Sequence, residues 1–176
     1  MAAFTNLDWT RFDVWSIVAE SGLAVVDDVY RDACRAWLGR QGYGISTIDF
    51  GGGVGPAVVE MGALFRWEEQ FGYAMTPDHR NLDALRDGFV FDFSAGEGKV
   101  LELLHPDKAY REDSRWFLGL LSIGAEYSRW QLALGHRFFI VLVLPEWSKL
   151  PGITYESNTV PVPFRHIGNR TTPFDE

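Results

Sequence analysis

The most restrictive feature of the sequence is an apolar run at residues 137–144, RFFIVLVL, in which seven apolar side chains follow one arginine. A strand with one solvated face alternates apolar and polar residues, and this run does not alternate. Such a strand suits a position that is covered on both faces, which is typical of parallel sheets flanked by helices. The sequence therefore predicts an α/β fold built around a parallel sheet.

Two shorter segments also have the composition of strands, and helical patterns separate the three. The shorter strands are YGISTIDF at residues 43–50 and KVLELL at 99–104, which are rich in β-branched residues or leucine. The predicted helices cover residues 56–72, part of 80–93, and 114–134. Strands that alternate with helices in this order predict a three-stranded parallel sheet with helices packed on it.

The chain is predicted to be a single domain over residues 1–176, with an appendage at each end of the core. The core is residues 43–145. An N-terminal extension, residues 1–42, has room for one or two extra strands and a helix near residues 29–41. The C-terminal tail, residues 146–176, is rich in proline and has little periodicity, which predicts an irregular segment.

Charge and cysteine content limit the classes of partner. The net charge of −8 repels nucleic-acid backbones and anionic membranes, and it favours a basic protein or a small cation. Cys34 is the only cysteine, so no disulfide forms within the chain, and no run of about 18 apolar residues could span a membrane. We therefore expect a soluble cytoplasmic protein that binds neither nucleic acid nor membranes.

Signals for catalysis or cofactor binding are weak. The Gly51–Gly55 loop follows a strand and opens a helix, which is the setting of phosphate-binding loops, but Pro56 stands where such a motif needs glycine. The histidines, His79, His105, His136 and His166, show no metal-ligand spacing, and no G-x-S-x-G elbow is present. No cofactor is expected, and a nucleotide-binding protein or small α/β enzyme that uses Gly51–Gly55 stays as an alternative.

The segment RNLDALRDGFVFDF, residues 80–93, predicts a short helix with an acidic outer face. Asn81 is a favourable N-cap, and Leu82 and Leu85 are spaced to face inward. Asp83 and Asp87 are four residues apart, so they project side by side from the opposite surface. On this pattern alone, a solvated helix face remains an adequate explanation.

The same segment resembles the barstar family of ribonuclease inhibitors, whose characteristic motif is Asn-Leu-Asp-Ala-Leu followed by an aromatic residue and Asp. The order of elements over residues 43–145 is also similar. The resemblance implies a cytoplasmic immunity protein without enzymatic activity that plugs the active site of a basic nuclease toxin. The sequence leaves the oligomeric state open, with a monomer favoured. It further implies that Asp83 and Asp87 stand in for RNA phosphates and pair with cations in the nuclease cleft.

The sequence departs from the family at several positions. PDHR at residues 77–80 replaces a Tyr-Tyr-Gly loop, Arg86 replaces the aromatic residue, and Trp130 falls near the position of an acidic residue on the last helix. The resemblance therefore leaves open a barstar-like scaffold that serves as a non-inhibitory interaction module. The expected partner-binding residues are Asp78, His79, Arg80, Asn81, Asp83, Arg86 and Asp87.

Overall fold

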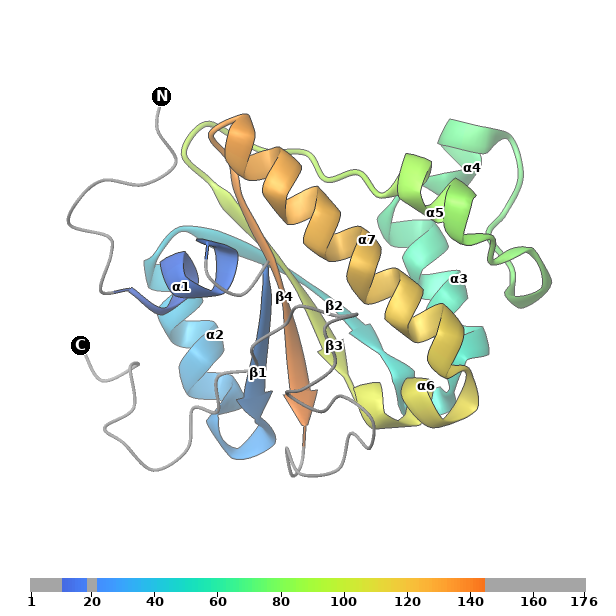
Figure 1. Ribbon diagram of the computed structural model, residues 1–176, viewed down its shortest axis with the longest axis horizontal. Coiled ribbons are helices and arrows are strands. Elements are labelled where there is room, and N and C mark those ends of the chain that lie inside the picture. Colours follow the sequence, from blue (N-terminus) through green and yellow to red (C-terminus); the bar gives the residue numbers. More distant parts are fainter. Residues whose placement is uncertain (1–10, 19–21, 145–176) are drawn as a thin grey trace.

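A computed structural model describes residues 11–18 and 22–144 of the chain. Their centre is a sheet of four parallel strands in the order β1-β4-β3-β2 (Figure 1). The strands are β1 (Leu23–Asp27), β2 (Tyr43–Asp49), β3 (Gly98–Leu104) and β4 (Arg137–Leu144). The three strands predicted for the core are therefore confirmed within one residue at each end.

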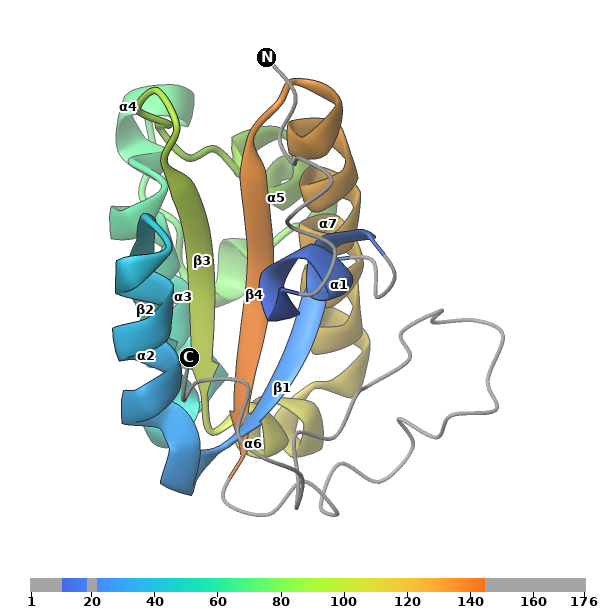
Figure 2. The ribbon, with the colours of Figure 1, turned by 90° about the vertical axis from the view of Figure 1, so that its left-hand side faces the viewer.

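Helices cover both faces of this sheet. They are α1 (Phe12–Val18), α2 (Arg31–Arg40), α3 (Val54–Leu64), α4 (Trp67–Phe71), α5 (Leu82–Gly88), α6 (Pro106–Glu112) and α7 (Ser114–Ala133). Three single 3-10 turns precede α2, α3 and α5, at Asp28–Tyr30, Phe50–Gly52 and Pro77–His79. Figure 2 looks onto the face covered by α1 and α2, and α3 to α7 pack on the opposite face.

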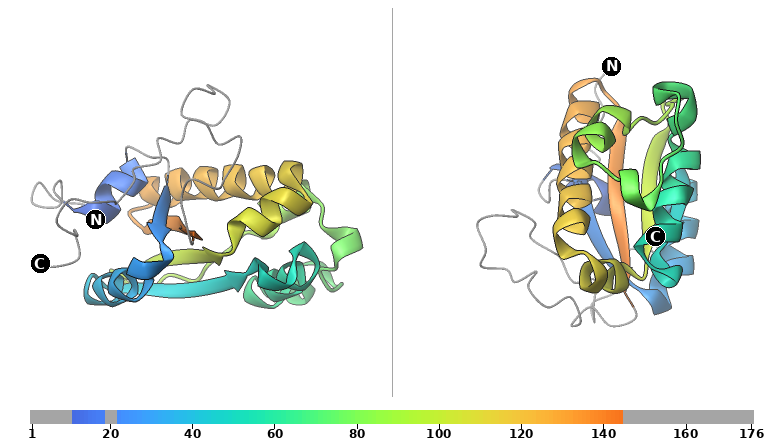
Figure 3. Two further views of the ribbon diagram at one scale, coloured as in Figure 1. Left: turned by 90° about the horizontal axis from the view of Figure 1, so that it is seen from below. Right: turned by 90° about the vertical axis from the view of Figure 1, so that its right-hand side faces the viewer.

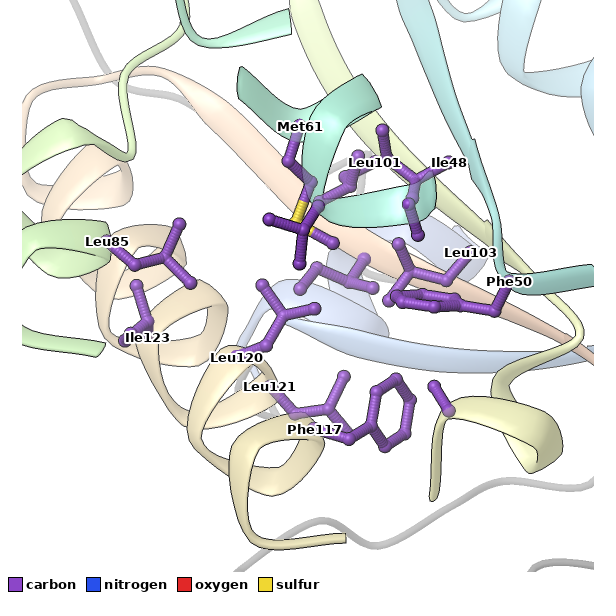
Figure 4. Packing of buried hydrophobic residues seen from close by; sticks show 14 of the residues in the cluster. Ile48, Phe50, Met61, Leu85, Leu101, Leu103, Phe117, Leu120, Leu121 and Ile123 are labelled. Carbon is purple, nitrogen blue, oxygen red and sulfur yellow. The ribbon is translucent and has the colours of Figure 1, made fainter. Parts of the chain in front are cut away.

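Strand β4 explains why the apolar run does not alternate. Its side chains enter two different cores: Phe138, Ile140 and Leu142 pack with α3 to α7, and Phe139 and Val141 pack with α1 and α2. Every residue after Arg137 in this strand is buried. Figure 4 shows part of the larger core, in which leucines of α7 meet side chains from the sheet and from α3.

The expectation of a three-stranded sheet is wrong by one strand. β1, which belongs to the N-terminal extension, pairs in parallel with β4 and lies at the edge of the same sheet. The preceding residues, 12–18, which could have been a second extra strand, form α1. The buried side chains of Val14 and Ile17 are three residues apart, which is a helical spacing and places both on one face.

The helix predicted over residues 56–72 is two helices. Arg66 adopts a left-handed conformation with φ 51°, and it separates α3 from α4. The break allows Phe65 and Trp67, on either side of it, to be almost fully buried. The predicted stop at Gly72 is confirmed, because this residue caps α4 in the left-handed region.

The predicted long helix is confirmed as α7. Asp113 is its N-cap, and the Asp113 carboxylate accepts a hydrogen bond of 3.0 Å from the Trp116 N–H. Despite its 20 residues, α7 is not apolar enough to cross a membrane, and neither is any other helix among the described residues. The expected irregular tail at 146–176 lies outside the part of the chain that the structure describes.

Helix α2 is tied to the sheet through a buried carboxylate on β3. Glu102 is only 3% exposed and receives hydrogen bonds from Arg31 at 2.9 and 3.1 Å and from Arg35 at 2.5 Å. The Thr47 hydroxyl of β2 donates a further bond of 2.9 Å to Glu102. This network fixes α2 over the sheet in one orientation.

Candidate functional site

Helix α5 starts where its sequence predicts, directly after Asn81. The Asn81 side chain accepts a hydrogen bond of 2.8 Å from the Asp83 N–H, which is the expected N-cap. Leu85 points into the core beside Ile123 of α7 (Figure 4). Phe89 follows the helix and is almost fully buried, so both ends of this short helix are anchored.

Two glycines let α5 lie close to its neighbours. A Cβ atom on Gly119 of α7 would lie 2.5 Å from a methyl carbon of Leu82. One on Gly88 would lie 2.7 Å from ring carbons of both Trp67 and Phe71. The right-hand view of Figure 3 shows α5 held between α7 and the α3–α4 side of the molecule. The helix is therefore a fixed support for the side chains on its outer face.

Three charged residues form the outer face of α5. Asp83, Arg86 and Asp87 are all exposed, and the Asp83 side chain is 90% exposed. The Arg86 guanidinium lies 3.2 Å from the Glu126 carboxylate of α7 and 3.9 Å from that of Asp83. Within the described residues no ion pair involves Asp87. Asp83 and Asp87 are thus both exposed on α5, as predicted, and Arg86 beside Asp83 reaches across to α7.

The loop ahead of α5 is held by an ion pair. The Arg80 guanidinium lies 2.9 Å from the Asp113 carboxylate and also donates to the Pro77 carbonyl oxygen. The Trp116 N–H and Arg80 together lower the pKa of Asp113. Arg80 therefore fixes the loop to the start of α7, whereas Asp78 and His79 are exposed beside it.

Beside α5 the structure contains a groove that the sequence did not predict. It encloses about 630 Å³ between residues 86–93 and the last turns of α7. Its lining residues are Arg86, Asp87, Phe89, Val90, Phe91, Asp92, Phe93, Ile123, Glu126, Tyr127, Trp130, Gln131, Leu134 and His136. The sequence feature that could have indicated this groove is FVFDF, residues 89–93, because its alternating phenylalanines put three rings along one short segment.

Two amides of the Gly51–Gly55 loop are already bound to carboxylates. The Asp49 carboxylate accepts from the Gly51 N–H at 2.6 Å, and the Glu112 carboxylate accepts from the Val54 N–H at 2.9 Å. A bound phosphate would meet these two carboxylates, and like charges repel. This geometry counts against the nucleotide-binding alternative.

The remaining candidate groups are metal ligands, the histidines and Cys34. No group of three or more His, Cys, Asp or Glu side chains in the part of the chain that the structure describes could hold a metal ion. His105 hydrogen-bonds Asp49 at 2.6 Å, which lowers the pKa of that carboxyl group, and His166 lies outside the described residues. Burial raises the pKa of the Cys34 thiol to about 12, so it behaves as a small buried apolar residue.

Comparison of the chain with models of protein families, with curated proteins and with solved structures found no match.

Proposed function

We propose that the chain is a barstar-like immunity protein that binds a basic nuclease toxin, a ribonuclease, and covers its active site with α5. The observation that carries the proposal is the pair of outward carboxylates, Asp83 and Asp87, on a helix that is packed in place at both ends. Two carboxylates four residues apart on a helix present two negative charges on one face, so they suit a cationic cleft that recognises RNA phosphates.

The charge of the whole chain supports the same partner. A net charge of −8 attracts a basic protein over long distances, and electrostatic attraction mainly increases the rate of association. Rapid capture is what an immunity protein requires, because the toxin must be bound before it reaches cellular RNA. We expect both proteins to meet in the cytoplasm, where that RNA is.

The rigid support of α5 is a second argument for an inhibitory surface. Side chains that are ordered before binding lose less conformational entropy when the complex forms. Gly88 and Gly119 allow close packing under α5, and the Arg80–Asp113 ion pair holds the loop that precedes it. The backbone that carries Asp83 and Asp87 is therefore already in place in the free protein.

The architecture is compatible with the family resemblance. Strands β2, β3 and β4 and the helices between them occur in the order that the resemblance implies, and the NLDAL motif lies at the start of α5. β1, α1 and α2 are additions on the opposite face and at the far edge of the sheet, so they leave the outer face of α5 exposed.

Inhibition of RNA cleavage tests the proposal. The probes are barnase and any basic nuclease domain that is encoded near the gene for this chain. Asp87→Ala is expected to weaken inhibition by at least about 30-fold, the loss that corresponds to a 2 kcal/mol interface hot spot. Asp28→Ala removes the same charge from an exposed position before α2, and it serves as the matched control.

The two variants separate a local from a general charge effect. If Asp87 contacts the nuclease, Asp28→Ala inhibits almost as well as the wild type and Asp87→Ala does not. Equal, small losses in both variants would mean that only net charge matters and that α5 is not the inhibitory surface. Asp87 is exposed and forms no ion pair within the described residues, so its loss leaves the fold intact.

A further inference from the structure

The groove beside α5 carries an unusual concentration of exposed apolar side chains. Trp130 is 69% exposed, Leu134 is 60% exposed and Val90 is 43% exposed, and all three line the same groove. Single exposed apolar residues are common on protein surfaces, but several around one concavity mark an interaction site. Trp130 is the largest of them and lies on the outer side of α7.

The inner wall of the groove is rigid. The Phe91 ring contacts Tyr127 and Phe138 at centroid distances of 6.0 and 5.1 Å, and the Phe91 N–H donates a 3.0 Å hydrogen bond to the Tyr127 hydroxyl. Phe93 stacks on His136 at 4.7 Å with an interplanar angle of 15°. The groove is therefore formed before a partner binds, which lowers the entropic cost of filling it.

The groove is continuous with the acidic face of α5. Arg86 and Asp87 line both surfaces, and Asp92 and Glu126 complete the charged rim. Together with Arg66, which pairs with Asp92, this gives three carboxylates against two guanidinium groups, a net negative charge that suits a basic partner. Glu126 is already paired with Arg86 at 3.2 Å and Asp92 with Arg66 at 3.1 Å, which leaves Asp87 as the rim carboxylate without a partner in the described residues.

We infer that an apolar side chain protruding from the nuclease inserts between residues 89–93 and α7 and packs on Trp130, while Asp87 binds a neighbouring cation of the nuclease. This inference rests on the proposed function and adds the chemistry of the partner. An aromatic or aliphatic side chain suits the floor of rings, and its burial would cover Trp130 and Leu134. Desolvated aromatic anchors of this kind contribute most of the affinity in many interfaces.

The experiment is a calorimetric titration at low and high salt. The probes are catalytically inactive barnase and an inactive form of any basic nuclease domain that is encoded near the gene. The variants are Trp130→Ala, Trp130→Leu and Trp130→Glu, together with Asp87→Ala. Val29→Ala is the control, because Val29 is 78% exposed and lies before α2, away from the groove. Sedimentation of the free wild type and of Trp130→Glu shows whether a second copy covers the groove.

The expected result distinguishes an apolar contact from a charged one. Trp130→Ala weakens binding about 30-fold at both salt concentrations, because apolar contacts are not screened by ions. Trp130→Leu retains most of the affinity, Trp130→Glu abolishes binding, and Val29→Ala binds like the wild type. The loss in Asp87→Ala becomes smaller at high salt, as expected for an ion pair.

Four other results overturn the inference. Normal binding by Trp130→Ala, with loss in Asp87→Ala, leaves the proposed function standing without the groove contact. Equal or tighter binding by Trp130→Glu means that a cation of the nuclease occupies the groove. A wild-type dimer that Trp130→Glu converts to a monomer means that a second copy occupies it. If the wild type binds none of the nucleases, the proposed function fails and the inference fails with it.

Discussion

Replacing Glu102 by alanine is expected to destabilise the fold more than replacing Arg31 or Arg35, the two cations of α2 that pair with it. The carboxylate is 3% exposed and accepts four hydrogen bonds, two from Arg31 and one each from Arg35 and Thr47. Alanine removes the shared acceptor and leaves the two guanidinium groups without their buried counter-ion.

The solvent exposure of the arginines limits the size of this effect. Removing one member of a fully buried ion pair costs about 3–5 kcal/mol, because the other charge stays buried and unpaired. Here the side chains of Arg31 and Arg35 are 31% and 36% exposed, so both can turn partly toward water. We therefore expect Glu102→Ala to lower the free energy of unfolding by about 2–3 kcal/mol, below that range.

Urea denaturation followed by circular dichroism measures this loss. Glu69→Ala is the control, because Glu69 is 72% exposed and its ion pair with Arg66 spans 3.9 Å; such surface pairs contribute about 0–1 kcal/mol. Glu102→Gln keeps the volume and an acceptor for Thr47, so it should lie between the wild type and Glu102→Ala. Equal losses in Glu102→Ala and Glu69→Ala would refute the argument from burial.

The same network predicts how stability changes with acid. Burial alone would raise the pKa of Glu102, but hydrogen bonds from Arg31 and Thr47 and the charge of Arg35 outweigh burial and lower it below 4.5. Because the pKa is lower in the folded than in the unfolded chain, the stabilisation is complete above about pH 4.5 and is lost as the pH falls through the folded value. In Glu102→Gln this part of the acid dependence should be absent.

The remaining predictions concern packing and reactivity. Gly88→Ala should cost about 1–3 kcal/mol in thermal denaturation, because the new Cβ would lie 2.7 Å from the rings of Trp67 and Phe71. Gly39→Ala, which meets no atom within 4 Å, should be neutral or stabilising. The Cys34 thiol, with its pKa raised to about 12, should not react with Ellman's reagent at pH 8 until the protein is unfolded. Rapid labelling of the native protein would contradict that burial.

The elements that the sequence predicted well are those with strong local signals. The apolar run of β4 identified a covered parallel strand, and Asn81 identified the start of α5, because both depend on composition and spacing within a few residues. For β1, the sequence showed only that the N-terminal extension had room for a strand. Its pairing with β4 joins residues more than 100 positions apart, which no local pattern specifies.

The sequence predicted only the part of the candidate site that lies on α5. The spacing of Asp83 and Asp87 placed them on one face of α5, and the structure agrees. The ion pair between Arg86 and Glu126 joins two helices 40 residues apart, and the groove depends on how residues 89–93 cross α7. Both features require tertiary packing, so spacing within α5 gave no signal for them.

Calorimetric titration of the wild type and Asp87→Ala with inactive nuclease, at low and high salt, tests the central claim most directly. The account predicts tight binding by the wild type, weaker binding at high salt, and a loss of at least about 30-fold in Asp87→Ala at low salt. Wild-type binding that is indifferent to Asp87, or no binding to any of the basic nucleases, would contradict the claim that α5 is an inhibitory surface.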